Sequence, residues 1–444
     1  MAQIMKPRGP KGMRDFLPDD LIKRQYVFDT VVEVFEAFGF EPLQTPALEL
    51  RQTLHGNLGE EAEKQIFYAQ HPEGKEELAL RYDLTVPLAR VVAQYEGQLS
   101  FPFKRYHIAP VWRSERPQRG RYREFYQCDA DIVGVASMSA DAEIISLVVT
   151  ALRRLGFREF EVQINNRKLL TGIGEYVGVP EALRGGLYRS IDKLDKIGAE
   201  GVRTELVEAG LTADMIDRMM ALLAMRTGGL QSLQDLGREL AGIPVAEEGV
   251  RELLALAEHL DAFGVPAEHY TFDPAMVRGL GYYTGPVFET IITEPNLGSV
   301  TGGGRYDGLI GMFRKQSMPT TGSSLGIERI IDLMDVLGLY PPGLGRTVVQ
   351  VLVTVFGPET RPASQRFATL LREQGVRTEV MLEDRKLGKQ AAYADRKGIP
   401  LVAFLGSEEI NAGTVKLKRL ADGLERTVPQ AEAAQAVREM LQEA

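Results

Sequence analysis

The sequence is poor in cysteine and in long apolar runs. Cys128 is the only cysteine, so no disulfide can form within the chain, and a lone thiol suits a reducing cytoplasm. No apolar run approaches the roughly 20 residues that a membrane-spanning helix needs. The basic first residues also lack the apolar core of a secretory signal. We therefore expect a cytoplasmic protein without a membrane span.

Metal-ligand spacing is also missing. The five histidines show no paired ligand spacing, and no second cysteine is available to complete a site. A structural or catalytic zinc is therefore not expected. The formal net charge of −9 argues against a protein that coats nucleic acid through bulk positive charge, but it allows a local basic face on an acidic body.

The length and composition indicate several globular domains. A chain of 444 residues is too long for one ordinary core, so two or three domains are expected. The 44% hydrophobic and 25% charged residues are typical of a soluble globular protein. Periodicity predicts a helix over 20–38 that ends at Gly39, a strand that turns into a helix after Thr85, a helix over 141–155, and strands over 157–166, 287–292 and 298–304.

The composition then changes along the chain. Residues 169–272 are rich in Leu, Ala and Glu and helical in period, which predicts an inserted helical domain. The core domain would comprise 1–168 and 273–336, where the glycine-rich TGSSLGIERIIDLM enters a helix. Residues 337–346, LGLYPPGLGR, are predicted to be a linker. Residues 347–444 alternate strands and helices, beginning with the apolar, parallel-type strand VVQVLVTVF, and predict an α/β domain.

The segment RSERPQRGRYREFYQ, residues 113–127, carries the strongest functional signal. Five arginines are interleaved with Glu115, Tyr122, Phe125 and Tyr126. Guanidinium groups are planar forks that suit phosphate oxygens, and aromatic faces can stack on a nucleobase. The Pro-Gln-Arg-Gly step predicts a turn, so the segment should form a strand, a loop and a strand. The alternative is a solvated basic loop, which is the usual fate of a charge run.

Three other segments have both a functional and a structural interpretation. The triple glycine of GGGRYDGL, residues 302–309, lacks the ending of a phosphate loop, which favours glycines that let a ligand or strand approach the backbone closely. Arg278 lies among apolar residues and needs an anionic partner, in a ligand or in a salt bridge. Tyr282 and Tyr283 are expected to alternate across a strand, so that only one of them faces a ligand.

Acidic residues at the ends of apolar segments are also ambiguous. Asp83 in RYDLTVP and Asp131 in CDADIVG could bind a ligand, although most such acids cap turns or helices. Glu328 and Arg329 lie at the start of an apolar helix, where an intrahelical ion pair is the simpler interpretation.

Taken in order, these motifs resemble class II aminoacyl-tRNA synthetases, and specifically the histidyl-tRNA synthetase family. GFEPLQTP is similar to the family's first motif, RSERPQRGRYREFYQ to the second and GSSLGIERI to the third. RGLGYYTG and GGGRYDGL are similar to two segments peculiar to the histidine enzymes, and the likeness extends through LGKQAAYADRKGIPLVAFLG. The resemblance implies a mixed α/β fold, with an α+β catalytic core on a class II antiparallel sheet, a helical insertion, and a C-terminal α/β anticodon-binding domain.

The resemblance also implies a two-step reaction. The carboxylate of L-histidine attacks the α-phosphorus of ATP to give histidyl-adenylate and pyrophosphate, and the 3′ end of tRNA(His) then takes the acyl group. The implied catalytic residues are Arg278 and Arg113. The implied histidine-binding residues are Asp83, Thr85, Gln127, Asp131, Arg278, Tyr282 and Tyr283. The implied ATP-binding residues are Arg113, Glu115, Arg121, Tyr122, Phe125 and Arg329, with Mg²⁺ bound together with ATP.

Further partners follow from the same resemblance. It implies that Arg116, Gln118, Arg119 and Arg123 meet the acceptor end of the tRNA, and that the insertion touches the acceptor stem. The C-terminal domain would read the anticodon, with 384–386 and Lys389 as candidates, since RNA is read best at unpaired bases. The family also implies a homodimer with FEPLQTP near the two-fold interface.

One position departs from the family pattern, and two other functions stay open. Family members usually carry an aspartate where this chain has Gly281, which removes a negative charge close to Arg278. One alternative function is a synthetase paralogue that regulates the first enzyme of histidine biosynthesis and senses histidine. The other is a synthetase for another amino acid, such as threonine, proline or glycine.

Overall fold

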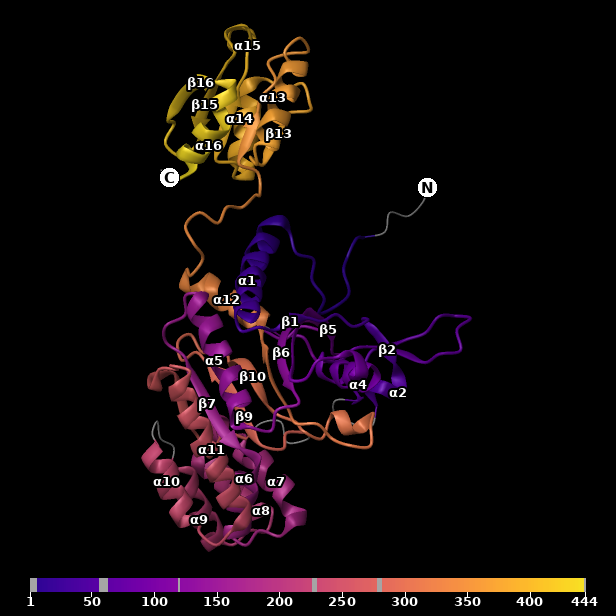
Figure 1. Ribbon diagram of the computed structural model, residues 1–444, viewed down its shortest axis with the longest axis vertical. Helices are drawn as coiled ribbons and strands as arrows, with labels where there is room; N and C mark the ends of the chain where they lie inside the picture. Colours follow the sequence, from indigo (N-terminus) through magenta and orange to yellow (C-terminus); the bar gives the residue numbers. More distant parts are fainter. Residues whose placement is uncertain (1–5, 56–62, 119, 226–229, 278–281, 443–444) are drawn as a thin grey trace. The chain divides into compact units, whose positions relative to one another are not determined.

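The computed structural model describes residues 6–55, 63–118, 120–225, 230–277 and 282–442 (Figure 1). The chain divides into two compact units, one formed by 1–15 with 27–340 and the other by 16–26 with 341–444. Three residues discussed above, Arg119, Arg278 and Gly281, lie outside the described residues.

The first unit is built on an eight-stranded sheet. Its strands are β1 (Glu41–Pro42), β5 (Phe103–Trp112), β6 (Glu124–Val133), β7 (Glu161–Asn166), β8 (Tyr270–Phe272), β9 (Pro286–Ile291), β10 (Ser299–Arg305) and β11 (Thr320–Leu325). Their order is β1-β5-β6-β11-β10-β9-β7-β8. The two outer pairs, β1–β5 and β7–β8, are parallel, and all other neighbours are antiparallel. The expected antiparallel core is thus confirmed.

Helices and a smaller sheet surround this core. The helices are α1 (Pro18–Ala37), of which 27–37 belong to this unit, α2 (Arg51–Leu54), α4 (Thr85–Tyr95), α5 (Met138–Arg154) and α12 (Ile327–Leu337). The smaller sheet has β2 (Leu48–Leu50), β3 (Tyr68–Ala69) and β4 (Leu78–Leu80) in the order β2-β4-β3. Helix α1 ends before Gly39, whose φ of +75° is a left-handed conformation that glycine adopts without strain. Helix α5 packs on β6, β10 and β11, and α12 packs on β6 and β10.

Strand β11 was not predicted from the sequence. Thr320–Leu325 pairs with both β6 and β10, whereas the glycine-rich pattern indicated only an entry into the following helix. Small residues hid the strand, because Gly, Ser and Thr give no apolar alternation to recognise. The helix itself begins at Ile327, two residues after the strand ends.

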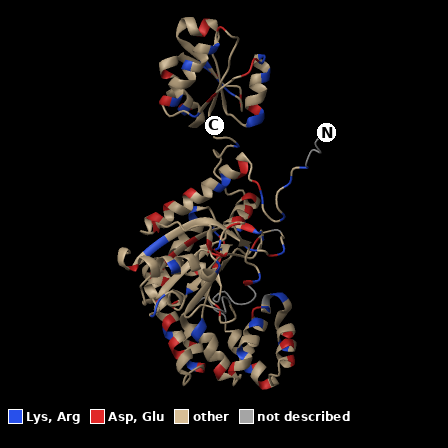
Figure 2. Cartoon of the chain, turned by 90° about the vertical axis from the view of Figure 1, so that its right-hand side faces the viewer, with Lys and Arg blue, Asp and Glu red and all other residues tan. Residues whose placement is uncertain are grey.

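A group of helices is inserted between β7 and β8. These helices are α6 (Arg167–Tyr176), α7 (Glu181–Ile191), α8 (Leu194–Glu208), α9 (Ala213–Leu223), α10 (Leu230–Glu239) and α11 (Pro244–Ala262). Helices α6 and α11 approach closely at Gly172, where a Cβ atom would lie 2.3 Å from that of Ala246. Charged residues of both signs are spread over these helices (Figure 2).

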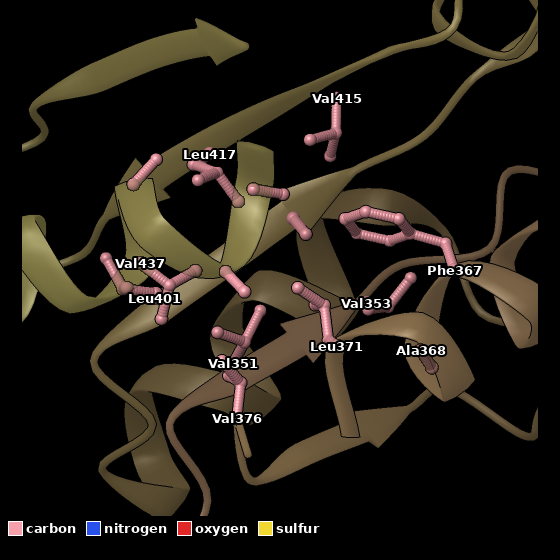
Figure 3. Packing of buried hydrophobic residues seen from close by; sticks show 14 of the residues in the cluster. Val351, Val353, Phe367, Ala368, Leu371, Val376, Leu401, Val415, Leu417 and Val437 are labelled. Atoms are coloured by element: carbon pink, nitrogen blue, oxygen red, sulfur yellow. The ribbon is translucent and has the colours of Figure 1, made fainter. Parts of the chain in front are cut away.

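The second unit contains a five-stranded sheet in the order β13-β12-β14-β15-β16. Its elements are β12 (Val351–Val353), α13 (Arg361–Glu373), β13 (Thr378–Val380), α14 (Leu387–Lys397), β14 (Leu401–Phe404), α15 (Ser407–Ala412), β15 (Thr414–Arg419), β16 (Glu425–Pro429) and α16 (Ala433–Gln442). Strand β12 is parallel to both neighbours, as its apolar sequence predicted. The side chains of Phe367, Leu371, Val415 and Leu417 point into one apolar core (Figure 3).

Candidate active site

Polar side chains and glycines gather on one face of the large sheet. Residues that lie directly opposite each other in paired strands place their side chains on the same face. The register aligns one row of Arg105, Asp131, Gly322 and Gly304, and a second row of His107, Asp129, Ser324 and Gly302. Since side chains alternate along a strand, both rows lie on the same face of the sheet.

The glycines of these rows make room for other groups. A Cβ atom on Gly322 would lie 1.9 Å from the Oδ1 atom of Asp131, so this position accommodates the carboxylate. A Cβ atom on Gly304 would lie 3.0 Å from the Tyr283 ring. Above Gly302 there is no atom within 4 Å, which leaves open space. The close approach predicted for the triple glycine is found at Gly303 and Gly304, where a Cβ atom would lie 2.3 Å from the Gly322 carbonyl oxygen and 2.6 Å from that of Pro286.

A cavity of about 440 Å³ lies over this face. Its volume is in the range of pockets that hold cofactor-sized ligands. The predicted ligand-binding residues that line it are Arg113, Glu115, Arg121, Tyr122, Phe125, Gln127, Tyr282, Tyr283 and Arg329, and Gly302 and Gly303 contribute backbone. Segments far apart in the sequence therefore converge on one cavity.

Tyr282 and Tyr283 correct one expectation. They lie before β9 rather than within a strand, so they do not alternate between opposite faces. Both line the cavity, their ring centroids lie 4.3 Å apart, and the Tyr282 hydroxyl donates to the Tyr283 hydroxyl at 3.1 Å. Pairing begins only after the two tyrosines: the Thr284 N–H donates to the Arg305 carbonyl at 2.8 Å, and Pro286 is the first residue of β9.

The arginine-rich segment forms the connection between β5 and β6. Gln118 and Arg121 exchange backbone hydrogen bonds of 3.1 and 2.9 Å, which closes the predicted turn. The Arg113 guanidinium lies 4.2 Å from the ring centroid of Tyr82 and 5.1 Å from that of Phe125. Its Nε atom donates to the Tyr82 carbonyl at 3.2 Å. These contacts hold the Arg113 side chain at the wall of the cavity.

The start of α12 lies next to this connection, since a Cβ atom on Gly120 would be 3.8 Å from the Arg329 side chain. Arg329 lines the cavity, and its Nη1 atom donates to the Ser299 carbonyl at 2.5 Å. Glu328 is buried and forms an ion pair with Arg14, whose guanidinium lies 3.3 Å from the ring centroid of Tyr122. Glu328 therefore has a partner from near the start of the sequence, whereas the sequence suggested an ion pair within the helix.

A buried acidic cluster lies beside the tyrosines. Asp131 is 2.7 Å from Arg105, and the Tyr306 hydroxyl donates to its carboxylate. Burial raises the pKa of Asp131, although the Arg105 charge and the Tyr306 hydrogen bond act in the opposite direction. The Tyr306 ring lies 6.2 Å from that of Tyr282, so a continuous line of side chains joins Asp131 to the cavity wall.

Asp83 has a structural contact as well. Its Oδ1 atom accepts hydrogen bonds from the backbone N–H groups of Thr85 and Val86, at 3.1 and 3.0 Å, at the start of α4. Burial raises the pKa of Asp83, and the hydrogen bond from Val86 and the Arg113 charge oppose this shift. Asp83, Thr85 and Asp131 do not belong to the cavity lining.

The loop residues predicted for tRNA also lie outside the lining. Arg116, Gln118 and Arg123 belong to the 113–123 connection, and the backbone N–H of Arg123 donates to the Gly12 carbonyl at 2.8 Å. Arg119 and Arg278 cannot be placed, because they lie outside the described residues.

Sequence reasoning missed four residues of this site: Arg105, Tyr306, Asp129 and Ser324. Two of them left a usable signal. Gln127, Asp129 and Asp131 are spaced by two, so a strand places all three on one face. Tyr306 lies within GGGRYDGL, where only the glycines were weighed.

An antiparallel sheet with a glycine-rich floor, an arginine-rich connection and a helix-borne arginine beside it is typical of a class II aminoacyl-tRNA synthetase. A family model of histidyl-tRNA synthetase matches residues 12–330, and a model of an anticodon-binding domain matches residues 350–440. The chain belongs to the histidyl-tRNA synthetase family.

Individual relatives are similar to this chain over nearly its full length. The histidine–tRNA ligase of Aeropyrum pernix is 45% identical and covers 98% of this chain and 99% of its own, and that of Gloeobacter violaceus is 41% identical over 96% and 97%. The crystal structure of histidyl-tRNA synthetase from Nostoc sp. PCC 7120 superposes with a TM-score of 0.87 at 31% identity, covering 98% and 100%. A Bacillus halodurans structure described as an ATP phosphoribosyltransferase regulatory subunit/histidyl-tRNA synthetase is 25% identical, with a TM-score of 0.75 over 88% and 97%.

Proposed function

We propose that this protein is a histidine–tRNA ligase that activates L-histidine with ATP and transfers it to the 3′ end of tRNA(His). The observation that carries the proposal is one cavity lined by Arg113, Arg121 and Arg329 and joined through tyrosines to the buried Asp131. Such a cavity combines cations for a polyphosphate with hydrogen-bonding groups for a polar side chain. Membership of the family supports the same activity.

The ATP half of the proposed reaction depends on charge neutralisation. Phosphoryl transfer needs mainly positioning and electrostatic stabilisation from the protein. Arg113 would hold the α-phosphate, Arg121 and Arg329 would hold the distal phosphates, and Phe125 would stack on adenine. The contacts of Arg113 with Tyr82 and Phe125 support this, because they fix the guanidinium before ATP binds. Arg278 would bridge the histidine carboxylate and the α-phosphate.

The histidine half is a problem of matching hydrogen bonds. A neutral imidazole has one donor and one acceptor nitrogen, and an α-ammonium group has only donors. Asp131 would accept from the imidazole, and Tyr283 would bind its other nitrogen. Asp83, Thr85 and Gln127 would accept from the ammonium group. Three buried or half-buried acids, Asp83, Asp129 and Asp131, interact with Arg105, and three carboxyl groups beside one guanidinium favour a cationic group such as the ammonium of histidine.

Class II synthetases use ATP, typically with Mg²⁺, and we propose that Mg²⁺ enters this site with the nucleotide. Mg²⁺ is usually held by one or two carboxylates together with substrate phosphates. Glu115 lines the cavity and provides such a carboxylate. No helix in the described part of the chain is long and apolar enough to cross a membrane. We place the proposed activity in the cytoplasm, where charged tRNA serves translation.

We propose that residues 1–168 with 273–336 form the catalytic domain, that 169–272 meet the tRNA acceptor stem, and that 347–444 bind the anticodon after a linker over 337–346. Arg116, Gln118, Arg119 and Arg123 would guide the acceptor end. The division of the chain near Tyr340 and the anticodon-domain match over 350–440 support this organisation.

We also propose a homodimer. Leu48 and Leu50 of β2 lie opposite Leu80 and Leu78 of β4, which places four leucines on one face of the smaller sheet. Leu48 and Leu50 are exposed, and a partner would cover such an apolar face. Sedimentation at micromolar concentration should give twice the monomer mass, and Leu48→Asp with Leu50→Asp should shift the protein toward monomer. A monomeric parent protein would contradict this proposal.

Histidine-dependent ATP–pyrophosphate exchange tests the proposed activity. We expect exchange with L-histidine, little with other amino acids, and charging of tRNA(His) in the full reaction. A histidine-sensing regulator would bind histidine without exchange, and a synthetase for threonine, proline or glycine would exchange with that amino acid instead. Either result would replace the proposal.

A further inference from the structure

Gln127 has an unusual hydrogen-bonding state at the edge of the cavity. Its Nε2 atom donates to the Ser324 hydroxyl oxygen at 3.1 Å. Its Oε1 atom is buried and has no hydrogen-bond partner within the described part of the chain. Gln127 lines the cavity. An amide oxygen in this state is available to accept from a ligand.

Ser324 explains why the amide lies this way round. Ser324 is directly opposite Asp129 in the β6–β11 register, and the two side chains share a hydrogen bond. When Asp129 is ionised its carboxylate can only accept, so in that state the hydroxyl proton of Ser324 is directed to Asp129. The Ser324 oxygen is then left as an acceptor, which attracts the NH₂ group of Gln127 and turns its carbonyl away.

The charges around Asp129 determine whether its carboxyl group is ionised, and so whether it orients the Ser324 hydroxyl. Arg105 favours the ionised carboxylate, whereas burial and the charge of Asp131 oppose it and raise the pKa of Asp129 to about 7. His107 lies opposite Asp129 in β5 and is neutral, because burial and the neighbouring Arg105 and Arg81 charges lower its pKa to about 3. A cation bound nearby would favour ionised Asp129 further.

We propose that Asp129 and Ser324 are positioning residues that hold the Gln127 carbonyl toward the α-ammonium group of histidine. The inference rests on the proposed function, since it assigns the group that Gln127 accepts from. Asp129 and Ser324 would act together, because Asp129 orients the Ser324 hydroxyl and Ser324 orients the Gln127 amide. Neither residue touches the substrate in this scheme; both act through the orientation of one amide.

Substitution of Ser324 tests the orientation through substrate binding. In Ser324→Ala the Gln127 amide can rotate, so KM for histidine should rise on the order of tenfold, the effect of one hydrogen bond to a charged group. KM for ATP should stay within about twofold, because the hydrogen bond that is lost is made to histidine and not to ATP. Ser324→Thr retains the hydroxyl and should restore most of the affinity. Asp129→Ala should behave like Ser324→Ala. Ser323→Ala, on the same strand but the other face, is the matched control.

A ligand without the amino group separates orientation from pocket shape. 3-(Imidazol-4-yl)propanoate should inhibit exchange with the same inhibition constant in the parent protein and in Ser324→Ala. In a Gln127→Glu background, where either oxygen can face the ammonium group, Ser324→Ala should have little further effect on KM for histidine.

Equal weakening of histidine and of the deaminated ligand would overturn the inference, because the hydroxyl would then shape the pocket as a whole. Unchanged KM for histidine in a folded Ser324→Ala protein would also overturn it. Both results leave histidine-dependent exchange by the parent protein intact. Absence of that exchange would instead remove the proposed function.

Discussion

The two sheets of this protein bury polar groups in different ways. In the C-terminal unit Gln390 is fully buried and fully bonded: its Oε1 atom accepts from the Val355 N–H, and its Nε2 atom donates to the carbonyls of Val355 and Arg385. On the site face of the large sheet, Gln127 Oε1 and Asp129 Oδ1 have no hydrogen-bond partner within the described part of the chain. Buried groups that a protein leaves unsatisfied are concentrated where a ligand completes them. The contrast separates a core made for stability from a face made for binding.

The largest expected effect is at Arg113. Arg113→Ala should lower the turnover number of histidine-dependent ATP–pyrophosphate exchange by about 10²–10³-fold, the scale of losing one transition-state charge stabiliser. The melting temperature should change little, because Arg113 stabilises the cavity rather than the core. Steady-state exchange and thermal unfolding measure both quantities. Near-normal turnover would show that the site face is not the place of chemistry.

The C-terminal core should respond in the opposite way. Leu417 is fully buried there, so Leu417→Ala should cost about 2–5 kcal/mol of stability in that unit. Hydrogen exchange monitored by mass spectrometry should show loss of protection over 347–440. Exchange of pyrophosphate should continue, while charging of tRNA should fall. A comparable loss of both activities would break the comparison between the two regions.

Gly322 tests whether the site face tolerates added volume. A Cβ atom there would lie 1.9 Å from Asp131 Oδ1 and 2.8 Å from the Ala130 carbonyl, so Gly322→Ala must displace the carboxylate. Overpacking of this kind costs about 1–3 kcal/mol. We expect a moderate loss of stability in urea and a larger rise in KM for histidine than for ATP. Gly343→Ala is the matched control, because a Cβ atom there meets no atom within 4 Å. Gly338→Ala is less suitable, because its φ of +63° would strain an alanine.

The smallest effect concerns pH. Burial raises the pKa of Asp129 to about 7, above the value of about 3.9 expected in the unfolded chain. The folded protein therefore binds the proton more tightly, and this contribution to stability is full below about pH 4 and is lost as pH rises through about 7. Asp129→Asn cannot ionise, so its melting temperature relative to the parent should improve between pH 5 and 8. A constant difference across that range would contradict the assigned shift.

Elements with a clear apolar periodicity could be predicted from the sequence, whereas strands that depend on pairing with distant residues could not. Helices such as 387–397 and the buried parallel strand near Val351 were predictable, because apolar periodicity marks them and local rules agree with the packing. The strands β15 and β16 were not identified: their residues alternate between half-buried and buried or exposed positions, with charged side chains on the outer face. Strand β15 is assigned through its pairing with β14, and β16 through its pairing with β15, rather than through a local signal.

At the site, sequence motifs identified the segments but not their contacts. The convergence of Arg113, Gln127, Tyr283 and Arg329 on one cavity agrees with the roles that the resemblance implied, which stay proposals. The partnership of Arg14 with Glu328 spans 314 positions, and the pairing of Asp129 with Ser324 depends on strand register. Neither is visible in a single sequence, because nothing local specifies which distant residue lies opposite.

The open space above Gly302 allows the shape of the cavity to be changed at one point. Because a side chain there would meet no protein atom within 4 Å, the backbone and the core are indifferent to a methyl group at this point. Gly302→Ala would therefore distinguish ligands by shape. A compound that contacts the cavity floor at this point would be excluded, and a compound that does not contact it would still bind. Together with substrate analogues that lack the group nearest Gly302, this variant would bind the smaller analogue and exclude the substrates of the parent protein.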